Sequence, residues 1–354
     1  MDERRPRMIP FVELKRPDYG HVRELLAASE GSGTWSNFGP LSRRLEQRAA
    51  ELLALPPGRT VVACANGTVA LHGLVHLHEH LVGRPLRWVV SAFTFHAQRQ
   101  GPLGTAIVVD CDARGYLDLD ALAALDPRSY DGIVVTHLFG TPRPVAAYEE
   151  VASRHGKHLL FDSATCFATG CEGAPVGGAG TAELYSFHHT KPCGFGEGGC
   201  VVVPAALEDT FRSLINFGLC KGIDTGARSG NGKMSDVAAA FILDRWRGLE
   251  SIAEAQRAQW RRLAAIARDL GLEVLVDGGG EGSLPNLVPI VFPRSVTLER
   301  FAHAPLVAHK YYRPLASRPR ADDLHARVVC LPCHAGVATL SNDALHATLA
   351  AALD

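Results

Sequence analysis

The sequence predicts an α/β fold in which a large domain is built on a mostly parallel sheet and a smaller α+β domain follows at the C-terminus. Three observations support this prediction. The chain has 354 residues, 47% of them hydrophobic, so it can bury more than one compact core. Short apolar runs alternate with helical patterns from residue 61 onward. A helical pattern over residues 235–270 then separates two groups of strand candidates.

Seven short apolar runs are the strand candidates of the large domain. They are continuous rather than alternating, which indicates strands buried on both faces of a sheet. Helix-length segments such as residues 118–126 and 144–155 lie between several of them, which favours parallel neighbours. The runs are VVAC (61–64), RWVVSA (87–92), AIVVD (106–110), GIVVTH (132–137), HLLFDS (158–163), AELYSF (182–187) and GGCVVV (198–203).

Two strand candidates and a closing helix make up the second part of the chain. The strands are NLVPIVF (286–292) and VVCLP (328–332), and the helix covers residues 341–352. We place the domain boundary after residue 245. Residues 1–245 then form the large domain with an N-terminal arm, and residues 246–354 form the linking helix and the small domain.

Composition excludes several classes of protein. The formal net charge of −1 does not suggest nucleic acid or a membrane surface as a partner. We find no run of about 18 apolar residues that would span a membrane, and residues 1–10 lack the apolar centre of a signal peptide. Nine scattered cysteines fit reduced thiols in a cytosol. We therefore expect a cytoplasmic protein.

Neither cysteine nor histidine spacing predicts a metal site. Cys330 and Cys333 form a CxxC without a second ligand pair, and a strand end explains them better. His72, His76 and His80 share one face of a helix that also carries His78, and a solvated helix surface is the preferred interpretation.

Lys191 lies in the segment SFHHTKPCGFGEGG, residues 186–199, between a strand and a glycine-rich turn. An amine attacks a carbonyl only in its neutral form, and partial burial lowers the pKa of a lysine and supplies that form. An ordinary loop lysine is the alternative, and the segment alone does not exclude it.

Asp162 ends the apolar run HLLFD, and ligands of open α/β sheets lie beyond the carboxyl ends of the strands. An aspartate there can keep a pyridinium nitrogen protonated. A helix cap, or a contact with ribose or Mg²⁺, explains the residue equally well.

A candidate phosphate site follows the first strand. In ANGTVAL (65–71), Gly67 and Thr68 would present backbone N–H groups and a hydroxyl at a helix N-terminus, and Ser186 can add a second hydroxyl. A plain capped helix is the alternative. Phe95, in SAFTFHA (91–97), is the candidate for stacking on a flat ring, although most such phenylalanines belong to a core.

The order of these motifs, from phosphate turn through aromatic and strand-end aspartate to lysine, resembles the DegT/DnrJ/StrS-type sugar aminotransferases, a family of pyridoxal 5′-phosphate (PLP) enzymes of fold type I. The resemblance covers nearly the whole chain. It is carried by WSNFGPLSRRLE (35–46), ANGTVAL, FTFHA, DCDARGYLDLDAL (110–122), VTHLFGTP (135–142), FDSA, SFHHTKPCGFGEGG and GNGKMSDVAAA (230–240).

The resemblance implies a role for each matching residue. Lys191 would hold PLP as a Schiff base and carry a proton during the reaction. Asp162 would bind the pyridine nitrogen, and Phe95 would stack on the ring. Gly67, Thr68 and Ser186 would bind the phosphate. Thr165 stands where many members have a Gln or His that touches the ring hydroxyl. Asn231 would reach the cofactor of a partner subunit, which implies a homodimer with composite sites; a turn residue is the alternative.

The resemblance also implies the reaction, in which glutamate or glutamine gives its amino group to a keto group of a sugar, a nucleotide-sugar or a cyclitol. His309, Lys310, Tyr312 and Arg313 are candidate substrate contacts, or an ordinary polar loop. A PLP-dependent lyase or condensing enzyme and a catalytically silent regulator with the same fold are the alternatives. A Rossmann dehydrogenase is disfavoured because ANGT, not GxGxxG, follows the first strand.

Overall fold

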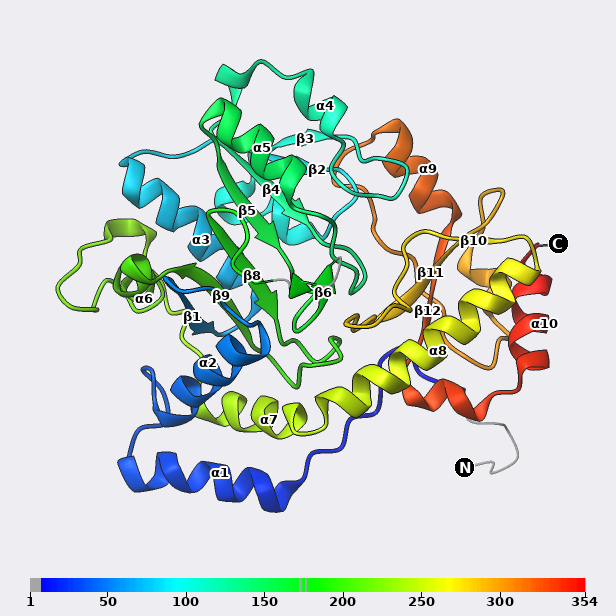
Figure 1. Ribbon diagram of the computed structural model, residues 1–354, viewed down its shortest axis with the longest axis horizontal. Helices are drawn as coiled ribbons and strands as arrows, with labels where there is room; N and C mark the ends of the chain where they lie inside the picture. Colours follow the sequence, from blue (N-terminus) through cyan, green and yellow to red (C-terminus); the bar gives the residue numbers. More distant parts are fainter. Residues whose placement is uncertain (1–7, 172–173, 176, 354) are drawn as a thin grey trace.

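The computed structural model describes residues 8–171, 174–175 and 177–353, and its centre is a seven-stranded sheet in the order β1–β9–β8–β5–β4–β2–β3 (Figure 1). The strands from β8 to β3 pair in parallel, whereas β9 is antiparallel to both β8 and β1. The predicted mostly parallel sheet is therefore confirmed. The strands are β1 (Arg59–Cys64), β2 (Trp88–Ser91), β3 (Ile107–Val109), β4 (Gly132–Thr136), β5 (His158–Asp162), β8 (Ala182–Ser186) and β9 (Gly199–Pro204).

Helices pack on both faces of this sheet, which explains why its strands are apolar at successive positions. In β1, Val61 is buried in one core cluster and Val62 in another. α1, α2 and α7 lie together along the lower part of Figure 1. The helices are α1 (Tyr19–Ser32), α2 (Pro40–Leu52), α3 (Gly67–Val82), α4 (Leu119–Ala123), α5 (Ala146–His155), α6 (Glu208–Leu214) and α7 (Asp236–Trp246).

Asp236 fixes α2 against α7. Its buried carboxylate accepts hydrogen bonds from the backbone N–H groups of Leu41 and Ser42, both at 2.9 Å, and from Ser29 Oγ at 2.7 Å. Because the first N–H groups of a helix have no partner within it, this side chain caps α2 from another element.

The C-terminal part is a three-stranded antiparallel sheet, β10–β11–β12, packed against helices on the right of Figure 1. The smaller α+β part is therefore confirmed, whereas its boundary after residue 245 stays a prediction. Its elements are α8 (Leu249–Asp269), β10 (Glu273–Val274), β11 (Leu287–Val291), α9 (Pro319–Arg327), β12 (Val328–Pro332) and α10 (Asn342–Leu353).

Shorter elements lie between these helices and strands. They are the strands β6 (Gly170–Cys171) and β7 (Ala174–Pro175), which pair with each other, and the 3₁₀ turns η1 (His96–Arg99), η2 (Gly101–Leu103), η3 (Pro127–Ser129), η4 (Ala205–Leu207), η5 (Gly226–Arg228), η6 (Leu298–Phe301) and η7 (Ala335–Thr339).

The single helix expected over residues 235–270 is wrong, because the chain breaks there into α7 and α8. Gly248 is the N-cap of α8, with backbone angles outside the helical region. Glycine is a poor helix former because it loses more conformational freedom than other residues when it is fixed. The break turns α8 away from the large sheet toward the C-terminal one (Figure 1).

Residues 9–18, which we call the N-terminal arm, connect the two sheets. The N–H of Ile9 donates to Pro305 O at 2.8 Å, and the N–H of Val307 donates to Ile9 O at 2.9 Å. In Figure 1 the dark blue arm runs from the C-terminal part to α1. Asp18 ends the arm as the N-cap of α1.

The solvated surface expected for the histidines of α3 is wrong for His78, which is only 4% exposed. Its ring packs edge-on against Trp88 and His158, and burial lowers its pKa to about 4. Cys330 lies within β12 and Cys333 follows it, which confirms the strand-end interpretation.

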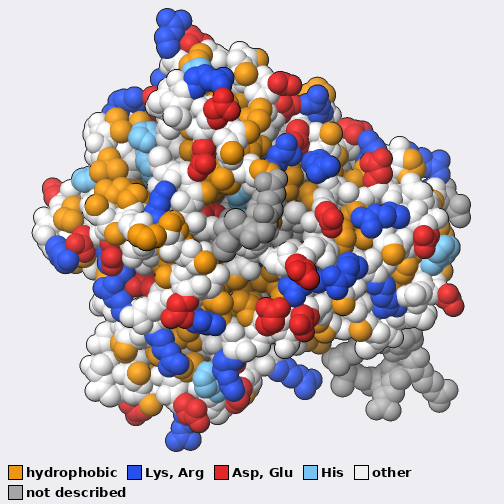
Figure 2. Space-filling view, viewed as in Figure 1, with side chains coloured by type: hydrophobic (Ala, Val, Ile, Leu, Met, Phe, Trp, Pro, Cys, Tyr) orange, Lys and Arg blue, Asp and Glu red, His pale blue; other side chains and the backbone are white. Residues whose placement is uncertain are grey.

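Charged side chains of both signs are interspersed over the face seen in Figure 2. Over the described part of the chain, no helix combines the length and the apolar character needed to cross a membrane.

Candidate active site

Three predicted residues converge at one edge of the large sheet. Asp162 is the last residue of β5, Ser186 is the last of β8, and Gly67 begins α3 just after β1. β1 and β8 run in the same direction because both are antiparallel to β9. Their carboxyl ends therefore meet where open α/β sheets bind ligands.

Asp162 is a buried carboxylate with two fixed donors. Its Oδ2 accepts a hydrogen bond from Gln98 Nε2 at 2.8 Å, and its Oδ1 accepts one from the N–H of Ala164 at 3.1 Å. Burial raises the pKa of Asp162, while these donors and the charge of Lys191 oppose the rise. The carboxylate is thus held in one orientation and in a costly environment.

Lys191 lies in a tightly folded loop. Its backbone N–H donates to His188 O at 2.8 Å, and its carbonyl accepts from the N–H of Gly194 at 3.0 Å. A Cβ on Gly194 would lie 2.2 Å from Phe187 O, so only glycine permits this turn. Burial lowers the pKa of the Lys191 amine, and the charge of Asp162 opposes that shift. The lowered pKa favours the neutral amine that reacts with carbonyls.

The N-terminus of α3 forms a cradle of N–H groups beside Ser186. Asn66 caps the helix, with Oδ1 accepting from the N–H of Val69 at 2.9 Å. The N–H groups of Gly67 and Thr68 lie in the first turn, which has no acceptor within the helix. A Cβ on Gly67 would lie 3.0 Å from Ser186 Cβ, so glycine is needed for this close approach. The arrangement suits an anion.

Phe95 and Thr165, two further predicted cofactor residues, differ in exposure and contacts. Phe95 directly precedes the turn η1 and is 53% exposed, whereas Phe93 is fully buried in the core. Thr165 is buried, and its hydroxyl donates to His137 O at 3.1 Å and accepts from the N–H of Gly140 at 3.2 Å. Phe95 is thus available to a ligand, while Thr165 braces the loop after β4.

Asn231 is exposed, and its Oδ1 accepts from Lys233 Nζ at 2.8 Å. The adjacent Gly232 carbonyl accepts from the N–H of Ala65 at 2.8 Å, just ahead of the α3 cradle. The segment around Asn231 therefore lies beside the cradle of its own chain. Its predicted contact with a partner subunit stays a prediction.

The predicted substrate residues differ in availability. His309 and Arg313 are exposed. Lys310 is half-buried, and its Nζ donates to Val296 O and Ala326 O, both at 2.8 Å. The ammonium of Lys310 is thus engaged by the C-terminal part, while His309 and Arg313 face solvent.

Tyr312 belongs to an aromatic cluster beside the carboxylate. Its ring stacks on Phe139 with centroids 5.2 Å apart and meets Phe93 edge-on at 5.7 Å. Burial raises the pKa of Tyr312 well above its usual value, and the charge of Asp162 contributes. Tyr312 therefore brings the C-terminal part of the chain to the site.

Sequence reasoning missed two residues of this region, Gln98 and Lys15. Gln98 is fully buried and donates to Thr136 Oγ1 at 2.5 Å as well as to Asp162. A glutamine just after the run FTFHA was the only available signal. Lys15 donates from the N-terminal arm to carbonyls of the Lys191 loop. No motif around Lys15 indicates this contact.

Comparisons with known proteins point to one family. The DegT/DnrJ/EryC1/StrS aminotransferase family model matches residues 20–349. The Mycobacterium tuberculosis protein Rv3402c is 31% identical over 253 residues, which cover 68% of this chain and only 61% of that protein. The L-glutamine:2-deoxy-scyllo-inosose aminotransferase of Streptomyces fradiae is 26% identical over 351 residues, covering 87% of this chain and 81% of that enzyme.

A solved structure matches the whole fold. The crystal structure of DesI in the presence of its TDP-sugar product superposes with a TM-score of 0.80 at 27% identity, covering 98% of this chain and 94% of that one. The predicted fold type I architecture is therefore confirmed.

Proposed function

This chain belongs to the DegT/DnrJ/EryC1/StrS aminotransferase family, and on that premise we propose that it is a PLP-dependent aminotransferase. Glutamate or glutamine would give its amino group to a keto group of a sugar, a nucleotide-sugar or a cyclitol. The observation that carries the proposal is that two buried groups, the carboxylate of Asp162 at the end of β5 and the amine of Lys191 in the loop after β8, lie close enough for the charge of each to act on the pKa of the other. The acceptor class follows from the names of the Streptomyces enzyme and of DesI.

The α3 cradle fits the phosphate of PLP. Gly67 lets the helix N-terminus approach Ser186 so closely that a Cβ would crowd the serine side chain. The N–H groups of Gly67 and Thr68 and the hydroxyls of Thr68 and Ser186 are all donors that suit a phosphate dianion. The positive end of the 16-residue helix α3 adds favourable electrostatics.

The pyridine ring would lie between this cradle and Asp162. PLP, when bound, withdraws electrons from the carbon next to the amino group, provided that its ring nitrogen keeps a proton. The Asp162 carboxylate would hold that proton, and Gln98 and Ala164 fix both of its oxygens for the task. We propose the exposed Phe95 as the stacking residue and the buried Thr165 as a neighbour of the ring.

Lys191 would hold the cofactor as a Schiff base and then act on protons. Once displaced by the amino donor, its amine can take the proton from the donor Cα and return it at C4′ of the cofactor. Burial keeps the pKa of this amine below its ordinary value, which suits a group that must both accept and release a proton.

Substrate recognition by the C-terminal part is proposed for residues 309–313. His309 and Arg313 are exposed and can meet acidic or hydroxylated groups. Lys310 and Tyr312 would act indirectly, because the ammonium of Lys310 binds two carbonyls and the ring of Tyr312 is packed on Phe139.

We also propose a homodimer with composite sites. The loop after α6 exposes Phe217 and Leu219, which are 55% and 73% exposed, and Asn231 follows on the same loop. Exposed apolar side chains of this size favour burial against a protein surface. If a partner subunit packs against this loop, Asn231 would contact the cofactor of that partner.

The function is tested by the half-reaction, which needs no acceptor. The purified chain is mixed with PLP and with glutamate or glutamine, and the keto acid and pyridoxamine phosphate are quantified by chromatography. We expect equal amounts of both products from at least one donor. Absence of any keto acid with every donor tried would contradict transamination.

Gln98→Leu should weaken the site without removing any proposed catalytic group. Loss of the donor to Asp162 Oδ2 raises the pKa of Asp162 further, since that hydrogen bond stabilises the charged form more than the neutral one. We expect kcat/KM to fall about ten- to hundredfold, the cost of a hydrogen bond to a charged group. The acid limb of its pH profile should move to higher pH. Gln100→Leu, at an exposed position of the same segment, is the control; an unmoved acid limb in Gln98→Leu would refute this role.

Mixing two inactive variants, Lys191→Ala and Asn231→Ala, tests the composite site. If Asn231 serves the partner, each mixed dimer has one intact site, and refolding equal amounts together should restore about a quarter of the wild-type activity. If Asn231 serves its own chain, as its closeness to the cradle also allows, no mixed dimer has an intact site. Activity after mixing that equals the sum of the separate variants would therefore contradict the composite arrangement.

A further inference from the structure

We propose that Lys15 is a positioning residue for Lys191, because its ammonium clamps the loop that carries Lys191 to the N-terminal arm. This inference rests on the proposed function in one respect only: the loop is taken to present the reactive amine.

The contacts of Lys15 match the donors of an ammonium group one for one. Its Nζ lies 2.6 Å from His189 O, 2.5 Å from Lys191 O and 2.6 Å from Gly194 O. An ammonium has three N–H donors and no acceptor, so these three carbonyls use its whole capacity. Burial, reinforced by the charge of Arg245, lowers the pKa of Lys15 to about 8, which leaves the side chain mostly protonated at neutral pH.

Two residues of α7 bind two further carbonyls of this loop. Arg245 Nε donates to Pro192 O at 3.0 Å, and the indole N–H of Trp246 donates to Cys193 O at 2.9 Å. The loop is therefore held from outside at five of its six carbonyls between residues 189 and 194. Four of these five bonds come from the charged groups of Lys15 and Arg245, and charge-assisted bonds are stronger than bonds between neutral groups.

The arm that supplies Lys15 is itself anchored on both sides of it. Arg245 pairs with Glu13, His334 Nε2 lies 2.9 Å from Pro10 O, and the N–H of Asp18 donates to Asp244 Oδ2 at 3.0 Å. These contacts tie the arm to the C-terminal part and to α7. Because the arm is fixed on both sides of Lys15, the contacts of Lys15 also fix the position of the loop.

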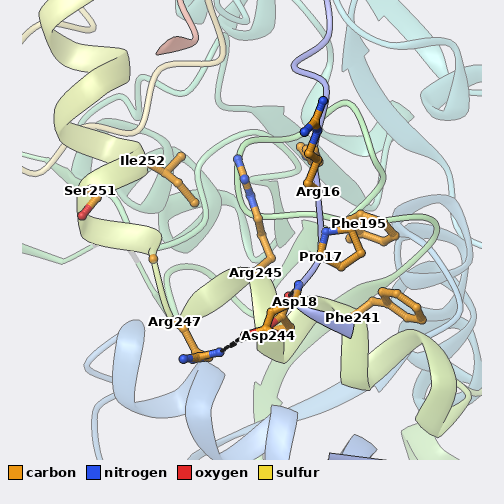
Figure 3. A pocket seen from close by; sticks show the side chains of 12 residues that line it. Arg16, Pro17, Asp18, Phe195, Phe241, Asp244, Arg245, Arg247, Ser251 and Ile252 are labelled. Carbon is orange, nitrogen blue, oxygen red and sulfur yellow. Dashed lines mark hydrogen bonds and ion pairs between the residues drawn. The ribbon is translucent and has the colours of Figure 1, made fainter. Parts of the chain in front are cut away.

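A cavity of about 360 Å³ lies next to this clamp, between the arm and the junction of α7 with α8 (Figure 3). Phe195, at the end of the Lys191 loop, stacks on Phe241 of α7 at its rim, and Arg245 extends between the arm and α8. Packing between the arm and the loop is incomplete on this side, which leaves more of their connection to the polar contacts of Lys15 and Arg245.

The test compares Lys15→Met with Lys15→Arg and with Arg16→Met, which removes a cation from an exposed position of the same arm. Hydrogen–deuterium exchange is measured on the full chain without cofactor. In Lys15→Met, the amides of His189, Lys191 and Gly194 should exchange at least about tenfold faster, while those of β4 and β5 stay unchanged. Lys15→Arg should restore part of the protection, and Arg16→Met should match wild type.

Turnover gives the second readout. A positioning role predicts that Lys15→Met lowers kcat about tenfold or more and leaves KM for the amino donor nearly unchanged, with partial recovery in Lys15→Arg. Equal loop exchange in wild type and Lys15→Met would overturn the proposal. If Lys15→Met does not fold, Lys15→Gln, which keeps two donors, decides by the same exchange measurement. Exchange needs no cofactor, so its result is independent of whether the proposed aminotransferase activity is found.

Discussion

Replacing Lys191 by alanine is expected to remove the visible absorbance of lysine-bound cofactor and to lower kcat by at least about 10⁴-fold. The variant loses both the covalent attachment point and the amine that moves protons at the donor Cα. The loop itself should survive, because its carbonyls are held by Lys15, Arg245 and Trp246 rather than by the Lys191 side chain. Absorbance after addition of PLP and the half-reaction with glutamate are the measurements.

Lys157→Ala is the matched control for this experiment. Lys157 directly precedes β5, at the opposite end of the strand from Asp162, and its Nζ donates to Tyr130 O at 2.8 Å. The substitution Lys157→Ala removes a lysine from the same domain but leaves the sheet edge that carries the site unchanged. A Lys191→Ala protein that retained absorbance and turnover would mean that another lysine holds the cofactor.

The strands of the large sheet could be predicted because burial on both faces leaves continuous apolar runs, such as the one that became β4. The direction of β9 relative to its neighbours could not be predicted. A buried strand such as GGCVVV has the same apolar composition whether it pairs in parallel or antiparallel. Its sequence therefore does not show that β9 is antiparallel to β8. The break between α7 and α8 was missed for a related reason, since one glycine inside a long helical pattern is often tolerated.

Those residues of the candidate site that lie in local sequence motifs could be predicted. Asp162 ends a strand, Gly67 opens a helix and Lys191 lies in a glycine-rich turn, and parallel topology brings such positions to one edge. Gln98 and Lys15 reach the site from 64 and 176 residues away in the chain. Their roles depend on how the turn η1 and the N-terminal arm pack, which no periodic pattern encodes. The buried His78 was missed because only tertiary packing decides which helix face is covered.

Asp162→Asn is expected to lower kcat by about 10³-fold or more while leaving the cofactor-free protein at least as stable as wild type. An amide cannot hold the proton on the pyridine nitrogen, so the cofactor would lose its electron-withdrawing power. Stability behaves differently because folding raises the pKa of Asp162. A carboxyl whose pKa is raised by folding costs the folded state stability once the pH exceeds the unfolded value of 3.8, so the advantage of the amide should grow as the pH rises above that value and level off once the pH exceeds the folded pKa.

The hydrogen-bond network around residue 162 can adapt to the amide. Gln98 Oε1 is buried without a partner among the described atoms, so a flip of the Gln98 side chain would let it accept from the new amide and from Thr136. Asp236→Asn is the control, since Asp236 is equally buried but caps α2 through Leu41 and Ser42, and its loss should lower the melting temperature without removing a proposed catalytic group. Melting curves of both cofactor-free variants against pH, together with half-reaction rates, separate the two carboxylates. A lower melting temperature for Asp162→Asn at every pH would mean that Asp162 stabilises the fold and that its burial is not a cost borne for function.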